Sequence, residues 1–169
     1  AGLMGSGIAE VCARAGLDVV VREVDAVACE RGRDRIVGSL DRAVRNGKIS
    51  EAERDAAVSR LHVTSDFADL ADRQLVVEAV IEDESLKTSV FRELDRHVAD
   101  PAAILASNTS SIPIMKLGIA TQRPEQVIGI HFFNPVPVLR LVELVTSLLT
   151  STETASAAES FAAESLGKR

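Results

Sequence analysis

Apolar residues along the chain follow two different spacings. Five nearly continuous apolar runs have the length of buried strands, and they lie at 19–21, 75–81, 104–106, 127–132 and 141–145. Between them, apolar positions recur at helical spacing and end at glycine, asparagine or capping signals. These helical segments are 5–15, 25–45, 50–61, 84–98, 114–117 and 152–166. Strands that alternate with helices predict an α/β fold with a doubly wound, mostly parallel sheet.

The helical pair at 25–61 is longer than a standard crossover between parallel strands, so we expect it to project from the sheet as a helical hairpin. A break at Asn46–Gly47 separates its two helices, and the capping box Ser50-x-x-Glu53 starts the second. The chain opens on a glycine-rich turn with no strand before it. We therefore expect residues 1–169 to be one dinucleotide-binding domain that lacks its first strand, taken from a longer protein.

Composition and charge narrow the classes of protein. Of the 169 residues, 46% are hydrophobic and 26% are charged, which is typical of a folded globular domain. The net charge of −6 disfavours general binding to nucleic acid or to anionic membranes. No apolar run approaches the roughly 20 residues of a membrane span. The two cysteines, Cys12 and Cys29, have no metal-binding or disulfide pattern, so we expect a cytoplasmic protein without a metal.

A nucleotide site is predicted at the first helix. The run Gly2-Leu3-Met4-Gly5 opens this helix, and such glycines let backbone N–H groups approach a pyrophosphate at a helix N-terminus. Glu23 follows the first strand, 21 residues after Gly2, where a carboxylate accepts hydrogen bonds from the adenosine ribose. Asp25 competes for that role. A carboxylate there repels a 2′-phosphate, so NAD is favoured over NADP.

Polar residues interrupt or follow the later strands at their carboxyl ends, where open α/β sheets bind ligands. His131 lies in one such strand, and Glu143 lies inside the next, between Val142 and Leu144. We expect Glu143 to be buried, and a buried carboxylate needs a partner. If that partner is His131, the carboxylate orients the imidazole for general acid–base catalysis.

Five segments together resemble the L-3-hydroxyacyl-CoA dehydrogenase family, with the closest likeness to its bacterial 3-hydroxybutyryl-CoA dehydrogenases. The likeness runs over the whole chain, in order and with matching spacing. The segments are Gly2-x-x-Gly5, Val77-Glu78-Ala79, Ser107-Asn108-Thr109-Ser110-Ser111, His131-Phe132-Phe133-Asn134-Pro135-Val136-Pro137 and Leu141-Val142-Glu143.

The resemblance implies a Rossmann-like fold and a role for each matching residue. His131 matches the general base, Glu143 the acid that orients it, and Ser110 the serine that hydrogen-bonds the 3-oxygen of the substrate. Asn134 matches a residue that holds the substrate or the catalytic loop. Four residues match positions near the nicotinamide half of NAD: Ala79, Glu82, Lys87 and Asn108.

The same resemblance implies an acyl-CoA substrate. Ser39, on the helical hairpin, matches a position near the coenzyme A nucleotide, and Arg45 or Lys48 can meet its phosphates. Family members continue into a mostly helical second domain, through which we expect a homodimer. The implied activity is NAD-dependent interconversion of short-chain L-3-hydroxyacyl-CoA and 3-ketoacyl-CoA in fatty-acid metabolism.

Three alternatives stay open at this point. The chain can be the dehydrogenase module of a multifunctional fatty-acid oxidation protein. It can be a sugar-acid dehydrogenase of the crystallin-like branch, which Phe132-Phe133 and Val136-Pro137 disfavour. It can also be a nucleotide-binding protein without catalysis, which the presence of His131, Glu143 and Ser110 disfavours.

Overall fold

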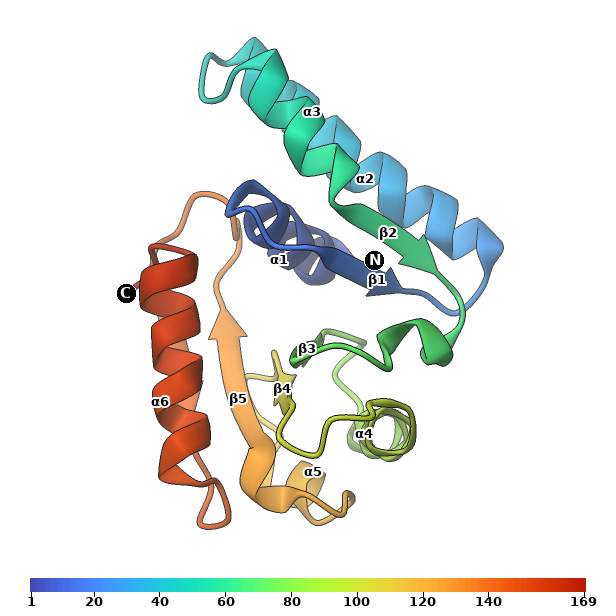
Figure 1. Ribbon diagram of the computed structural model, residues 1–169, viewed down its shortest axis with the longest axis vertical. Coiled ribbons are helices and arrows are strands. Elements are labelled where there is room, and N and C mark those ends of the chain that lie inside the picture. The colour runs from blue at the N-terminus through green and yellow to red at the C-terminus, as the bar shows by residue number, and fades with distance from the viewer. The chain divides into compact units, whose positions relative to one another are not determined.

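Parallel strands joined by helices run through the computed structural model, which describes Ala1–Arg169 (Figure 1). The chain divides into two units. The first unit combines Ala1–Asp66 with Asn134–Leu139, and the second combines Phe67–Phe133 with Arg140–Arg169. Each unit has its own sheet: two strands in the first and four in the second. The mixed α/β class and the Rossmann-like connection of the strands confirm the predicted fold class.

The first unit is built from helices around a two-stranded parallel sheet. Its elements are α1 (Leu3–Arg14), β1 (Val19–Arg22), α2 (Ala26–Arg45), α3 (Glu51–Ser59) and β2 (Leu61–Thr64). β1 pairs with β2 from Val19 opposite Leu61 to Arg22 opposite Thr64. A core of small and branched apolar side chains joins α1, α2, α3 and β2: Ala9, Ala13, Ile36, Leu40, Ala57 and Leu61.

The helices α2 and α3 form an antiparallel hairpin, which lies at the top of Figure 1. Asp25 caps α2 by accepting a hydrogen bond from the Ala28 N–H at 2.7 Å. The turn between the helices contains Gly47, whose φ of 66° favours glycine. Ser50 and Glu53 form the predicted capping box of α3. Capping residues therefore account for where each of the two helices begins, and the glycine turn accounts for the break between them.

The second unit contains a four-stranded sheet in the order β3-β4-β5-β6. Neighbouring strands are parallel, except that β6 runs antiparallel to β5 at the edge. The sheet and its helices and turns are β3 (Leu75–Glu78), β4 (Ile104–Ser107), β5 (Val127–Phe132), β6 (Val142–Val145), α4 (Glu84–His97), α5 (Ile114–Gly118), α6 (Thr152–Ser160), η1 (Phe67–Leu70), η2 (Pro124–Gln126) and η3 (Phe161–Ser165). Figure 1 draws α6 along β5.

Two element predictions were wrong in detail. The second helix of the hairpin ends at Ser59 and not near residue 61. Leu61–Thr64 is a strand that the apolar pattern did not predict. The strand expected at 75–81 ends at Glu78, because the chain turns there toward the Asp83 cap of α4. Both differences arise where one element follows another almost without a loop, so that the apolar pattern does not mark the boundary.

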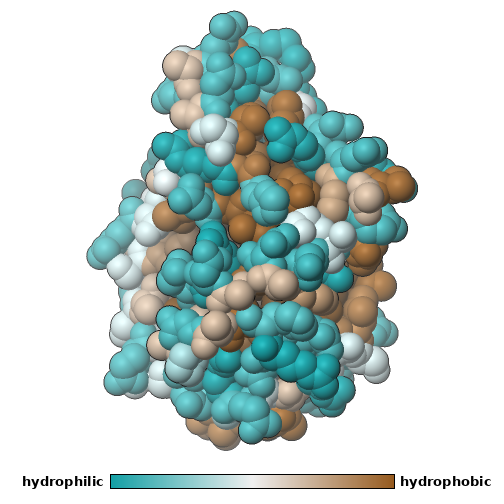
Figure 2. Space-filling view, turned by 45° about the vertical axis from the view of Figure 1, so that its right-hand side comes forward, coloured by the Kyte–Doolittle hydropathy of each residue, from teal (hydrophilic) through white to brown (hydrophobic).

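The surface of the chain mixes hydrophilic and apolar side chains, as Figure 2 shows for one face. The most exposed large apolar residues are Leu148, Ile81, Val24, Ile119 and Leu3, which come from both units. None of the helices is long and apolar enough to cross a membrane.

Candidate functional site

The N-terminus of α1 has the features of an anion-binding site. Gly2 is its N-cap and provides no side chain, and the first turn carries no acidic residue. A Cβ atom added at Gly2 meets no atom within 4 Å, so a ligand can approach the backbone there. The first N–H groups of a helix have no intrahelical partner and carry a partial positive charge. The predicted residues Gly2, Leu3, Met4 and Gly5 therefore fit the pyrophosphate of a dinucleotide.

Glu23 directly follows β1, as predicted. Its N–H donates to the Thr64 carbonyl at 2.8 Å, which fixes its backbone at the end of the two-stranded sheet. Its side chain is largely buried. The rival Asp25 is already used as the cap of α2. Glu23 is therefore the better placed acceptor for ribose hydroxyls.

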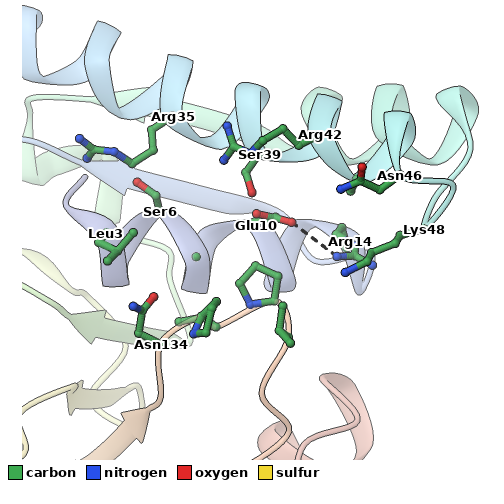
Figure 3. Close-up of a pocket in the computed structure, with 16 residues that line it drawn as sticks. Leu3, Ser6, Glu10, Arg14, Arg35, Ser39, Arg42, Asn46, Lys48 and Asn134 are labelled. Atoms are coloured by element: carbon green, nitrogen blue, oxygen red, sulfur yellow. Dashed lines mark hydrogen bonds and ion pairs between the residues drawn. The ribbon is translucent and has the colours of Figure 1, made fainter.

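A pocket of about 310 Å³ lies within the first unit, between α1, α2 and the segment Asn134–Val138 (Figure 3). Three of the predicted substrate residues line it: Ser39, Lys48 and Asn134. Arg45, which was predicted beside them, is not part of the lining, whereas Arg42 on the same helix is. The reason is helical geometry, because residues 39 and 42 share a face that residue 45 turns away from.

The pocket is rich in positive charge. Arg14 comes from α1, Arg35 and Arg42 from α2, and Lys48 from the turn after α2. One acid, Glu10, also lines the pocket; it is 2% exposed and lies 3.5 Å from Arg14 Nη1. Guanidinium and ammonium groups form charge-assisted hydrogen bonds with phosphate oxygens. The lining therefore suits a phosphorylated ligand.

In the second unit, polar side chains connect the carboxyl ends of three neighbouring strands. Asn108 follows β4, and its Oδ1 accepts the Phe132 N–H of β5 at 2.8 Å. The Asn108 N–H donates to the Glu78 carbonyl of β3 at 2.8 Å. The predicted residue Ala79 follows Glu78 directly and is partly buried. This end of the sheet is therefore held together by Asn108, and Ala79 lies at the same end.

The predicted cofactor residues Glu82 and Lys87 contact each other in the second unit. Lys87 Nζ lies 3.3 Å from Glu82 Oε2 and 2.7 Å from Oε1 of the buried Glu78. Desolvation raises the pKa of Glu82, but hydrogen bonds from Thr109 and Ser111 and the charge of Lys87 outweigh it and lower that pKa overall. Glu82 is therefore a carboxylate at neutral pH.

Ser110 lies in the loop that follows β4, between Thr109 and Ser111, and is exposed. Its two neighbours hydrogen-bond to Glu82, whereas the Ser110 hydroxyl has no protein partner. An exposed hydroxyl on a fixed loop can donate to an oxygen of a bound ligand.

His131 and Glu143 face each other across β5 and β6. They are register partners in the antiparallel ladder, and His131 Nδ1 lies 3.0 Å from Glu143 Oε2. The His131 ring also packs against Phe133, with 4.5 Å between ring centroids. When Nδ1–H donates to Glu143, the neutral ring keeps a lone pair on Nε2, so that Nε2 can accept a proton.

The expected burial of Glu143 was wrong. Its side chain is 56% exposed, although its neighbour Val142 is buried. Successive side chains of a strand point to opposite faces, so apolar neighbours on either side place a residue on the other face. The pairing with His131 is correct, but its cause is strand register and not the burial of an isolated charge.

The whole chain, residues 1–169, matches the family described as "3-hydroxyacyl-CoA dehydrogenase, NAD binding domain". It is 59% identical to 3-hydroxybutyryl-CoA dehydrogenase of Mycobacterium tuberculosis over 100% of this chain and 59% of that protein. The crystal structure of M. tuberculosis FadB2 superposes with a TM-score of 0.98 at 59% identity and the same coverage.

A second solved structure, (S)-3-hydroxybutyryl-CoA dehydrogenase PaaH1 from Ralstonia eutropha, is 41% identical. Its TM-score is 0.95, and the match covers 99% of this chain and 58% of that one. The chain thus spans about three fifths of the length of these relatives.

Proposed function

Because the chain belongs to the 3-hydroxyacyl-CoA dehydrogenase family and matches its NAD-binding domain, we propose that the complete protein interconverts L-3-hydroxyacyl-CoA and 3-ketoacyl-CoA. NAD is its cofactor, and short acyl chains such as 3-hydroxybutyryl are the proposed substrates. The observation that carries the proposal is the hydrogen bond between His131 and Glu143, in a chain that matches this family from end to end.

His131 is the proposed acid–base residue. In the oxidative direction its Nε2 takes the proton of the 3-hydroxyl group, and in the reductive direction imidazolium returns it. Glu143 holds the ring through Nδ1 and stabilises the imidazolium. When bound, NAD would supply the hydride acceptor for the same carbon in the oxidative direction, and NADH the hydride donor in the reductive direction. Ser110 donates a hydrogen bond to the 3-oxygen, which stabilises the negative charge that develops there.

For NAD itself we propose that different residues bind the different parts of the cofactor. The backbone N–H groups at Gly2, Leu3, Met4 and Gly5 bind the pyrophosphate, and Glu23 accepts from the adenosine ribose. Four residues are the proposed contacts of the nicotinamide half: Ala79, Glu82, Lys87 and Asn108. The open space at Gly2 and the absence of a side-chain cap support the first assignment.

For coenzyme A we propose the pocket of the first unit. Arg42 and Lys48 meet the phosphates, and Ser39 and Asn134 donate hydrogen bonds. The positive lining of this pocket is the support for that assignment. The family resemblance also leads us to propose a homodimer, which sedimentation of the complete protein tests.

Turnover of the complete protein tests the proposed function. With acetoacetyl-CoA as substrate, we expect NADH to be consumed and L-3-hydroxybutyryl-CoA to form as the only enantiomer. Binding of NADH without turnover of acetoacetyl-CoA or of longer 3-ketoacyl-CoAs would contradict the proposal, and would favour a nucleotide-binding protein without catalysis.

A further inference from the structure

Helix α1 and the segment Asn134–Leu139 meet at Gly7, and both belong to the first unit. A Cβ atom added at Gly7 would lie 2.9 Å from Val136 Cβ, 3.1 Å from Val136 Cγ2 and 3.6 Å from Pro137 Cδ. Cβ atoms in proteins essentially never lie closer than 3.0 Å to such an atom. Val136 is buried, so only glycine leaves room for its side chain at this point of α1.

The backbone of α1 does not itself require glycine at position 7. Gly7 lies inside the helix Leu3–Arg14, and the glycines with positive φ are elsewhere, at Gly16, Gly47 and Gly167. Glycine inside a helix is less favourable than alanine, because it loses more conformational freedom on folding. Space for the Val136 side chain is therefore the physical reason for glycine at this position.

The contact between Gly7 and Val136 forms part of the wall of the pocket that we assign to coenzyme A. Gly7 and the residues from Asn134 to Val138 line this pocket, and Figure 3 shows Asn134 and its segment beside α1. Asn134, the proposed substrate contact, is two residues away from Val136. Because two residues of backbone span only a few ångströms, a displacement of Val136 also moves Asn134.

Between the two partners of this contact, α1 is the fixed one. Ala9 and Ala13 of α1 are buried in the core of the first unit, and a close-packed core resists displacement. The segment is stabilised by a turn of its own, in which the Val138 and Leu139 N–H groups donate to the Pro135 carbonyl at 2.9 and 3.0 Å. A larger side chain at position 7 should therefore displace the segment and leave α1 in place.

We propose that Gly7 is a positioning residue for the substrate. The bare backbone of α1 at Gly7 receives the Val136 side chain, and this contact determines where Asn134 stands in the pocket. The inference deepens the proposed function and rests on it, because the purpose of the contact is the hydrogen bond from Asn134 to the acyl-CoA.

Kinetics of the complete protein separates substrate positioning from cofactor binding. Gly7→Ala should raise KM for acetoacetyl-CoA at least about fivefold, since overpacking displaces the segment. The Kd of NADH, measured by its fluorescence, should stay within about twofold. Gly118→Ala is the matched control, because Gly118 also lies in a helix and an added Cβ there would be 3.5 Å or more from Pro124. An unchanged KM in Gly7→Ala, or a raised Kd of NADH with an unchanged KM, would overturn the proposal.

Shrinking Val136 provides the rescue. Val136→Ala alone leaves a gap at the contact and should raise KM for acetoacetyl-CoA by a smaller factor than Gly7→Ala does. The double variant Gly7→Ala/Val136→Ala nearly conserves the volume, so its KM should lie below that of either single variant and within about threefold of the parent protein. If Gly7→Ala does not fold, the comparison of Val136→Ala with the double variant still decides. A double variant with a KM no lower than that of Val136→Ala would overturn the proposal.

Hydrogen exchange tests the contact without any turnover. In Gly7→Ala the amides of Val138 and Leu139 should exchange at least about fivefold faster, because the displaced segment loses its turn, and slow exchange should return in the double variant. Unchanged exchange in Gly7→Ala would overturn the proposal.

The failure of this inference and the failure of the proposed function have different signatures. If the parent protein did not turn over acetoacetyl-CoA, the proposed function would be wrong, and the positioning role would fall with it even if hydrogen exchange confirmed the contact. If the parent protein were active and Asn134→Ala raised KM, the effect of Gly7→Ala should nearly vanish in the Asn134→Ala background. Effects that multiply there would overturn the positioning role alone and leave the proposed function standing.

Discussion

His131 and Glu143 are opposite each other in the antiparallel pair of β5 and β6, and 3.0 Å separates His131 Nδ1 from Glu143 Oε2. Directly opposed residues of such a pair point to the same face of the sheet. The backbone register therefore brings the two side chains together. A change at either residue should leave the ladder intact and affect mainly the chemistry of the imidazole.

Glu23 should determine the preference for NADH over NADPH. A repulsion of about 1–2 kcal/mol between its carboxylate and a 2′-phosphate corresponds to a factor of about 5–30, and Glu23→Gln should narrow the preference by that factor. The ratio of kcat/KM for the two cofactors measures it. Asp25→Ser keeps the cap of α2, and should leave the ratio unchanged. A ratio that responds to Asp25 and not to Glu23 would reverse the assignment.

Substitutions of Arg42 and Arg45 should differ in their effect on KM for acetoacetyl-CoA, although both residues lie on α2. Arg42 lines the pocket of the first unit and Arg45 does not. Arg42→Gln should raise KM for acetoacetyl-CoA about twofold to fivefold, as expected for an exposed ionic contact, and leave KM for NADH unchanged. Arg45→Gln is the matched control. With acetoacetyl-pantetheine, which lacks the nucleotide, the Arg42 effect should disappear; an effect that persists there would contradict the assignment of the pocket.

Lys87→Met should destabilise the protein by about 3–5 kcal/mol, because it leaves the buried carboxylate of Glu78 without its cation. Urea unfolding measures the loss. The double variant Glu78→Gln/Lys87→Met removes both charges and should recover part of that stability. If the double variant were no more stable than Lys87→Met, Glu78 would not depend on Lys87 as its counter-charge.

Acid should weaken the hydrogen bonds by which Glu82 holds the loop that carries Ser110. The pKa of Glu82 is lowered from its ordinary value of 4.5, since the hydrogen bonds from Thr109 and Ser111 and the Lys87 charge outweigh desolvation. A lowered carboxylate pKa contributes stability above the unfolded pKa, and this stability is lost as pH falls through the folded pKa. An NMR titration of the Glu82 carboxyl carbon should therefore give a pKa below 4.5. A value at or above 4.5 would contradict the hydrogen bonds from Thr109 and Ser111 to this carboxylate.

Much of the fold could be predicted from local patterns in the sequence. The capping box of Ser50 and Glu53 and the break at Gly47 fixed the hairpin, and apolar runs marked β1, β4, β5 and β6. β2 was missed because it begins two residues after α3 ends, and its partner β1 lies some forty residues earlier. Strand pairing over such a distance leaves little local trace.

In the candidate site, too, local patterns predicted some features, whereas others depend on contacts between residues far apart in the sequence. Residue types and spacing indicated His131, Glu143 and Ser110, but not that Glu143 faces solvent or that Lys87 is buried. The position of Lys87 depends on Glu78, nine residues earlier on another element, and on the loop after β4. Such contacts exist only once helix and sheet have packed together, so the sequence did not predict them.

A double-mutant cycle on His131 and Glu143 in the complete protein tests the central claim most directly. General acid–base catalysis contributes roughly 10²–10⁴-fold, and we expect His131→Gln to lower kcat/KM for acetoacetyl-CoA by a factor in that range while NADH still binds. Glu143→Gln should cause a loss of similar size, since it removes the charge that orients and stabilises the imidazolium. The double variant should be little slower than His131→Gln alone. Losses that multiply in the double variant, or a His131→Gln variant with normal turnover, would contradict the account.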